Sequence, residues 1–264
     1  MAKMPALFVG HGSPMNVVLD NPFTRSLREW GRRLPRPRAV LVVSAHWLTD
    51  GTFVSCTPRP RTIHDFYGFP EELYAVAYPS PGAPEEAEHL TRAVGRAPVA
   101  CDDEWGLDHG AWSVLRHLFP GADVPVFQLS IDYSFNDRHP KPVRYHYDLA
   151  KDLRPLRDRG VLVVGSGNIV HNLSAIDFRD MDAPPYPWAL EFDERAGECL
   201  VADDHESLID FGTLGPSAPL AVPTLDHYLP MIYALALREE GEPLTFAHEG
   251  MQNASISMRC FQLG

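Results

Sequence analysis

Apolar runs alternate along this chain with stretches of helical spacing. Four short runs carry no charge and are typical of strands buried on both faces: 6–9, 39–44, 124–131 and 161–165. Segments 24–34 and 85–94 place apolar residues at helical spacing, and Pro84 followed by two glutamates suits a helix start. Strands that alternate with helices are typical of a parallel sheet with crossover helices. We therefore expect an α/β fold with a mostly parallel central sheet and helices on both faces.

The end of the chain has a different pattern, in which apolar and polar residues alternate. Over 254–263 the residues Ile256, Met258 and Cys260 fall on one side of an extended segment, and polar residues fall on the other. This period of two is typical of a half-buried strand. We expect this segment to close the sheet.

Segment 57–84 is rich in proline and aromatic residues, and it is too interrupted for long regular structure. One interpretation is a surface loop packed on the domain. The other is a lid, because long aromatic loops over a sheet edge often cover a binding site.

Length and composition indicate one globular domain over residues 1–264. The chain is 45% hydrophobic and shows no repeat or change of composition. Its formal net charge of −12 argues against nucleic acid or an anionic membrane as a partner, and favours a small-molecule ligand. No apolar run approaches the roughly 18 residues that a membrane helix needs. We expect a cytoplasmic protein with no membrane span.

The four cysteines are far apart in the sequence and form no C-x-x-C pair. Such spacing fits neither a zinc ribbon nor a disulfide-dense scaffold. We therefore expect Cys56, Cys101, Cys199 and Cys260 to be reduced thiols in the core.

Two histidines come directly after apolar runs. His11 stands in Gly-His-Gly-Ser-Pro and His46 in Ser-Ala-His-Trp, each where a predicted strand ends. The carboxyl ends of parallel strands form the crevice where ligands bind, so two imidazoles at two such ends can converge. The glycines beside His11 leave room for close approach. We interpret both histidines as metal ligands, in preference to ordinary buried histidines that find a polar partner.

A third ligand and a proton-transfer group have candidates of the same kind. His227 follows Thr224 and Asp226, which suit a helix cap, and this places it in a first helical turn. Taken alone, it could equally be a histidine that bonds solvent. His171 follows the strand at 161–165 and suits acid/base work, because imidazole titrates near neutrality.

The remaining histidines divide into two groups. His109 precedes a helical stretch and His64 belongs to segment 57–84, so either could line the pocket or be an ordinary loop histidine. The others are interpreted as ordinary polar residues: His89, His117, His139, His146, His205 and His248.

Six motifs in this order resemble the 4,5-DOPA extradiol dioxygenases, which belong to the class III extradiol, protocatechuate 4,5-dioxygenase-like superfamily. The resemblance covers essentially the whole chain. It is carried by Gly-His-Gly-Ser-Pro, Ser-Ala-His-Trp, Thr-Ile-His-Asp-Phe-Tyr-Gly-Phe-Pro, Leu-Asp-His-Gly-Ala-Trp, Gly-Ser-Gly-Asn-Ile-Val-His-Asn and Asp-His-Tyr-Leu-Pro.

The resemblance implies an α/β enzyme that opens a catechol ring beside its hydroxyls with dioxygen. It implies that His11, His46 and His227 bind the metal. His171 resembles the acid/base, and His109 and His64 resemble substrate-binding residues of the pocket. A carboxylate-bearing catechol such as DOPA would favour a cation in the pocket, and Arg61 is the candidate.

The expected metal is Fe²⁺ for activity, although Zn²⁺ is expected to bind as the protein is purified. The wider superfamily uses two histidines and one carboxylate, whereas His227 stands at the carboxylate position here. Three histidines with an open position also describe catalytic zinc. A zinc-dependent hydrolase is therefore the alternative enzyme, and a non-catalytic metal- or ligand-binding relative is the alternative outside catalysis.

Overall fold

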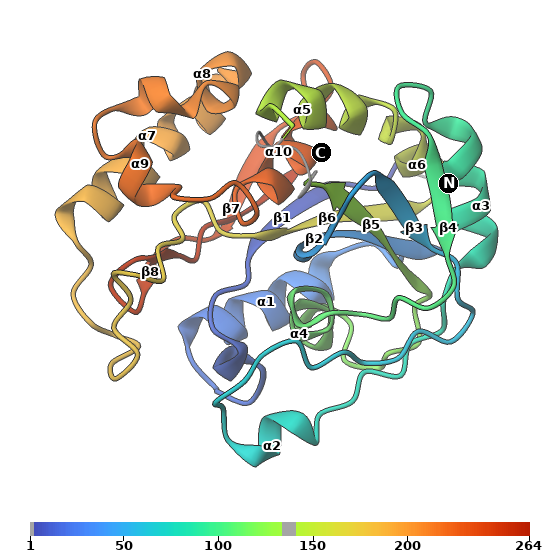
Figure 1. Ribbon diagram of the computed structural model, residues 1–264, viewed down its shortest axis with the longest axis horizontal. Coiled ribbons are helices and arrows are strands. Elements are labelled where there is room, and N and C mark those ends of the chain that lie inside the picture. Colours follow the sequence, from blue (N-terminus) through green and yellow to red (C-terminus); the bar gives the residue numbers. More distant parts are fainter. Residues whose placement is uncertain (1–2, 134–140) are drawn as a thin grey trace.

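The computed structural model describes residues 3–133 and 141–264. Among these residues, one sheet contains eight strands, drawn in Figure 1. In spatial order they are β4 (Val99–Asp102), β3 (Thr52–Ser55), β5 (Val126–Asp132), β2 (Ala39–Thr49), β6 (Val161–Gly167), β1 (Ala6–Gly10), β10 (Cys260–Leu263) and β7 (Leu244–His248).

The centre of this sheet is parallel, as the sequence predicts. Strand β6 pairs in parallel with β1 and β2, and β2 pairs in parallel with β5. Alternate side chains of β1 reach opposite layers: Phe8 packs into the core on one face, and Leu7 and Val9 pack into the core on the other. Because both faces are covered, an uninterrupted apolar run is stable in this strand. Because β1, β6 and β2 run parallel, their carboxyl ends lie at the same edge of the sheet.

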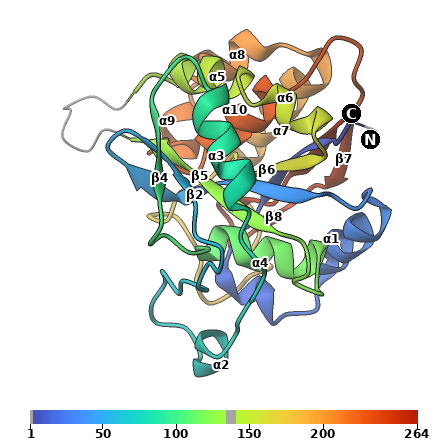
Figure 2. The same cartoon turned by 90° about the vertical axis from the view of Figure 1, so that its right-hand side faces the viewer.

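Helices cover both faces, as Figure 2 shows. One face carries α3 (Pro84–Ala93), α5 (Val143–Lys151), α6 (Arg154–Asp158) and α10 (Leu229–Ala236), and the other carries α1 (Pro22–Arg33) and α4 (His109–Leu118). The remaining helical segments are α2 (Glu71–Tyr74), α7 (Pro187–Ala202), α8 (His205–Ile209), α9 (Ala218–Ala221) and two 3₁₀ turns, η1 (Pro14–Val17) and η2 (Phe211–Leu214). In the described part of the chain, no helix is long and apolar enough to cross a membrane.

The C-terminal segment differs from the expected single half-buried strand. It forms β9 (Ile256–Ser257), which pairs with β8 (Met251–Gln252), and then β10. The polar residues Ser255, Ser257 and Arg259 are as buried as the apolar ones. Asp193 of α7 accepts hydrogen bonds from Ser257 and Arg259, and the Asn172 carbonyl oxygen accepts one from Ser255. Strand β10 pairs antiparallel with β1 and adds β7 as the edge strand.

The expectation of four reduced cysteines is wrong for one pair. Cys56 and Cys101 form a disulfide, with their Cα atoms 5.6 Å apart, whereas Cys199 and Cys260 are free. The two bonded cysteines are 45 positions apart in sequence, but the parallel pairing of β3 with β4 sets them side by side. Sequence spacing could not reveal this proximity.

The packing of α5 on α10 buries His146, whose Nδ1 lies 3.1 Å from the Tyr233 hydroxyl. Burial lowers the pKa of His146 to about 4. Between pH 6.5 and 4 the unfolded chain therefore binds this proton more readily than the folded chain, so acidification destabilises the fold. Glutamine cannot titrate, so in His146→Gln we expect the free energy of unfolding to fall less on acidification, by up to about 3 kcal/mol. Urea unfolding of both metal-free proteins at pH 7, 5.5 and 4.5 measures it, and parallel pH dependences would contradict the prediction.

Candidate metal centre

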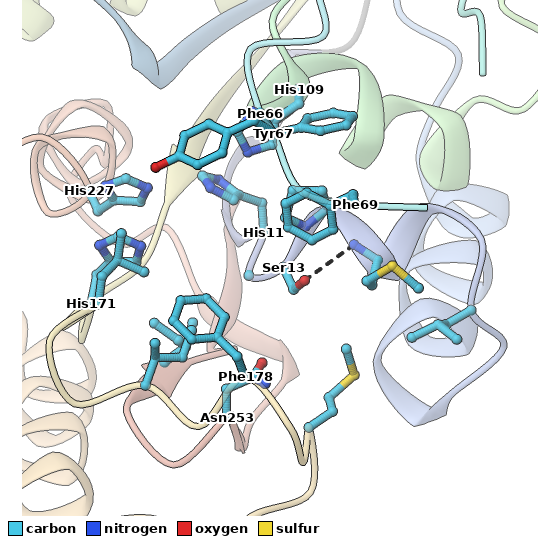
Figure 3. A pocket seen from close by; sticks show the side chains of 18 of the residues that line it. His11, Ser13, Phe66, Tyr67, Phe69, His109, His171, Phe178, His227 and Asn253 are labelled. Atoms are coloured by element: carbon cyan, nitrogen blue, oxygen red, sulfur yellow. Dashed lines mark hydrogen bonds between the residues drawn. The ribbon is translucent and has the colours of Figure 1, made fainter. Parts of the chain in front are cut away.

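Three histidines meet at the carboxyl edge of the sheet. His11 follows β1, His46 lies in the second half of β2, and His227 lies in the turn before α10. The Nε2 atoms of His11 and His46 are 3.1 Å apart, and the nearest ligand atoms of all three histidines lie within 4.8 Å of one another. Figure 3 shows the rings of His11 and His227 turned toward the same space. Two nitrogens about 2.0–2.1 Å from one ion are about 3.0–3.4 Å apart, so the observed spacing fits a shared metal.

Hydrogen bonds on the other ring nitrogen orient two of these histidines as ligands. His11 Nδ1 lies 3.0 Å from Ser166 Oγ, whose own proton is donated to the Gly110 carbonyl oxygen. Ser166 must therefore accept from His11 Nδ1–H, which leaves the Nε2 lone pair free for a metal. The Asp226 carboxylate likewise accepts from His227 Nδ1 at 2.5 Å. Both tautomers are assigned from the hydrogen-bond network.

Burial keeps two of the candidate ligands, His11 and His46, neutral. Desolvation, followed by repulsion from the neighbouring imidazoles, lowers the pKa of His11 and of His46 well below the ordinary value. Burial alone would raise the pKa of Asp226, but hydrogen bonds, first from His227, outweigh it and lower that pKa. Neutral imidazoles backed by an ionised carboxylate are a donor set that suits a divalent cation.

The glycines of the first motif have a different purpose from the one expected. Gly12 has φ +60°, and a Cβ on it would lie 2.6 Å from Met258 Sδ. The backbone conformation therefore favours glycine at this position, and the Met258 side chain packs closely against it. Gly167 has a comparable role, because a Cβ there would lie 2.2 Å from the His227 carbonyl oxygen. The Gly-Ser-Gly segment of β6 thus lets the turn that carries His227 approach the sheet.

His227 precedes its helix. Helix α10 begins at Leu229 with Tyr228 as its N-cap, so the expected cap at Thr224 or Asp226 is wrong. A hydrogen bond from Asn168 N–H to the His227 carbonyl oxygen, 2.8 Å long, ties this turn to the end of β6. The histidine is fixed by the sheet edge and not by a helical turn.

His171 lies against the candidate ligands, and its ring also offers a nitrogen within 4.8 Å of ligand atoms of Asp226 and His227. Its ring stacks on that of His227 with centroids 3.5 Å apart and an angle of 5° between the planes. Its backbone N–H donates to the Ala221 carbonyl oxygen. Burial, and then repulsion from His227, lower the pKa of His171, so the free imidazole is neutral.

His109 also lines this site, whereas His64 does not. His109 is the first residue of α4, and its ring centroid lies 3.9 Å from that of His46. Asp65, a residue that the sequence analysis did not single out, lies 2.9 Å from His109 Nδ1. The expectation that His64 lines the pocket is not met, because its Nε2 bonds the Val76 carbonyl oxygen and its ring packs on Trp112.

A cavity of about 480 Å³ opens beside these imidazoles. Segment 57–84 supplies Phe66, Tyr67 and Phe69 to one side of it, and Phe178 lies across from them in Figure 3. Tyr67 is 92% exposed and Phe178 76% exposed, so the rim is apolar and open to solvent. The volume suits a small aromatic molecule. Movement of segment 57–84 as a lid stays a prediction.

Of the histidines interpreted as ordinary, those that the structure describes lie outside this cavity lining. Ring nitrogens of His117, His146, His205 and His248 each have a hydrogen-bonding partner. His89 lies on α3, and His139 is outside the described residues.

Comparison with known proteins agrees with this site. A family model described as the catalytic LigB subunit of aromatic ring-opening dioxygenase matches residues 4–258. The chain is 45% identical to the 4,5-DOPA dioxygenase extradiol of Escherichia coli K12 over 99% of this chain and 95% of that protein. It is 34% identical to the protein of the same name from Beta vulgaris, over 95% of this chain and 92% of that protein.

A solved structure supports the same relationship. The crystal structure of an uncharacterized protein, JW3007, from E. coli K12 superimposes with a TM-score of 0.84 at 41% identity, and the match covers 99% of this chain and all of that one. The chain therefore belongs to the LigB family of aromatic ring-opening dioxygenases, and it is an extradiol ring-cleavage enzyme.

Proposed function

We propose that this enzyme opens the ring of a catechol with dioxygen, using one ferrous ion held by His11, His46 and His227. The observation that carries the proposal is the convergence of three imidazoles whose Nε2 atoms are available to bind a metal. A ferrous ion supplies open coordination positions and one-electron chemistry. Zinc supplies only Lewis acidity, so it cannot support this reaction.

The chain's own residues supply binding and proton transfer. The apolar cavity orients the flat ring, and His109 contacts a hydroxyl from the β2 side of the metal centre. His171, neutral and stacked on His227, accepts the second hydroxyl proton and returns it during ring opening. His171 thus acts beside the metal without a coordination bond.

The metal is the part of this proposal that most needs a test, because a donor set of three histidines also suits zinc. The test is oxygen consumption. Protein loaded with Fe²⁺ under anaerobic conditions is expected to consume oxygen in proportion to catechol lost and to form a yellow ring-opened product. No oxygen uptake by the iron-loaded protein would contradict the choice of iron.

Arg179, not Arg61, is the cation that meets the cavity. Arg61 is exposed and is absent from the cavity lining, which contradicts its expected place. Arg179 lines the cavity rim together with Phe178, and no carboxylate of the described residues lines the cavity. Relatives named 4,5-DOPA dioxygenase imply a substrate with a carboxylate, and we assign its recognition to Arg179.

Arg179→Met is expected to raise KM about tenfold for a catechol with a carboxylate side chain. A hydrogen bond to a charged group contributes about 1.5–3 kcal/mol, and the exposure of Arg179 favours the low end of that range. Neutral 4-methylcatechol is expected to show little change, and Arg61→Met is the matched control. Equal effects on both substrates would contradict this role.

A further inference from the structure

Asp65 connects three groups at the metal centre. Its Oδ1 accepts the backbone N–H of His109 at 2.8 Å, and its Oδ2 lies 2.9 Å from His109 Nδ1. The same Oδ2 lies 3.5 Å from Nδ1 of His46. Both oxygens of the carboxylate therefore contact His109 at the start of α4, and one of them also approaches His46, the proposed metal ligand on β2.

These contacts determine which nitrogen of His109 carries the proton. An ionised carboxylate can only accept, so Nδ1 of His109 must donate to Asp65. In the neutral ring, Nε2 then has a lone pair and no proton. Because His109 lines the cavity, this nitrogen is an acceptor for a substrate hydroxyl.

Asp65 could alternatively be a metal ligand, since its carboxylate and the rings of His46 and His109 offer atoms within 4.8 Å of one another. The positions of its oxygens argue against this. Both are engaged on the side of α4, and the oxygen near His46 approaches Nδ1, whereas Nε2 of His46 faces His11. Asp65 is also absent from the lining of the cavity.

Asp65 also precedes the aromatic residues of segment 57–84 directly. Phe66 contacts His109 edge-on with ring centroids 5.5 Å apart, and it contacts Phe69 at 5.3 Å. The hydrogen bonds of Asp65 thus hold the start of the aromatic wall against α4. Loss of these bonds would displace both His109 and the wall that contacts the substrate ring.

We propose that Asp65 is a positioning residue that fixes His109 as a hydrogen-bond acceptor toward the substrate hydroxyl and holds the aromatic wall of the cavity in place. This inference rests on the proposed function for the identity of the substrate. The positioning itself is a property of the protein without substrate.

Asp65→Asn tests the inference with little change in shape. An amide keeps one acceptor oxygen and replaces the other by a donor, so one of the two N–H groups of His109 loses its partner. In the metal-free protein labelled with ¹⁵N-histidine, we expect the wild type to show His109 as the Nδ1–H tautomer. We expect Asp65→Asn to lose that signal, while the Nδ1–H signal of His11, bonded to Ser166, remains.

Kinetics with the iron-loaded enzyme provide the second readout. We expect Asp65→Asn to lower kcat/KM for the catechol about 10- to 100-fold, mainly through KM, as removal of an outer hydrogen-bonding partner typically does. We expect the double variant His109→Ala, Asp65→Asn to have nearly the same kcat/KM as His109→Ala alone, because Asp65 acts through His109. Asp158→Asn, an exposed aspartate at the end of α6, is the matched control and is expected to match the wild type.

Two results would overturn the inference. One is that Asp65→Asn changes neither the Nδ1–H nor the backbone N–H signal of His109, and the other is additive losses of kcat/KM in the double variant. If Asp65→Asn instead lost iron with the tautomer of His109 unchanged, Asp65 would be a ligand. If the wild type opened no catechol, the proposed function would fail, and the NMR comparison would still decide whether Asp65 fixes His109.

Discussion

His227→Ala is expected to lose the metal and, with it, all measurable ring opening. The residue is one of three converging imidazoles, and its Nδ1 is held by Asp226, so its removal leaves two ligands and a carboxylate without its partner. Loss of a residue that only hydrogen-bonds to a metal ligand typically lowers metal affinity about 10- to 100-fold. Loss of a ligand itself should cost more, so we expect the affinity for the divalent ion to fall at least about 100-fold. Metal content after gel filtration, measured by mass spectrometry, tests this directly.

His89→Ala is the matched control for that variant. His89 lies on α3, outside the cavity lining, so its removal should leave metal content and turnover as in the wild type. The thermal unfolding of both metal-free variants shows whether the fold survives. A folded His227→Ala protein that retains a full equivalent of metal would mean that the third ligand lies elsewhere.

His171→Ala is expected to keep the metal and lose most of its turnover. A proton-transfer group typically contributes a rate factor of about 10² to 10⁴ and makes no coordination bond. The ring of His171 stacks on His227 and is not one of the three converging ligands, so metal content and rate should separate. Metal analysis and oxygen uptake on the same preparation measure both quantities. Loss of metal in this variant would make His171 a ligand.

The centre of the fold is predictable from sequence because its strands are buried on both faces. The runs at 6–9, 39–44 and 161–165 correspond to β1, β2 and β6, and burial on both sides excludes polar residues from them. Strands β3, β4 and β7 were not predicted. Strands β4 and β7 are the edge strands, where covering is incomplete, and β3 is mostly buried but has only four residues of mixed polarity.

The site shows the same division between local pattern and tertiary contact. His11 and His46 were predicted because strand ends meet at one edge of a parallel sheet. Asp65 was missed because an aspartate in a loop has no distinctive pattern and its bond to His109 joins positions 44 residues apart, and Asp226 was interpreted as a helix cap and not as the partner of His227. Their only sequence signal is adjacency to a histidine, in His-Asp and Asp-His.

Zinc is expected to occupy the site when the protein is purified in air. Three imidazoles do little to exclude it, and zinc binds such donors more tightly than ferrous iron does. Affinity therefore favours zinc, whereas the proposed ring opening requires ferrous iron. A protein sample that is inactive as purified would follow from this difference.

Metal exchange on one preparation tests the central assignment most directly. The metal is removed by a chelator, and separate portions receive Fe²⁺ or Zn²⁺ without oxygen; oxygen and a catechol are then admitted together. We expect the iron portion to consume oxygen and form a yellow ring-opened product, and the zinc portion to do neither. Equal inactivity of the iron portion, with one equivalent of iron bound to the three histidines, would contradict the account.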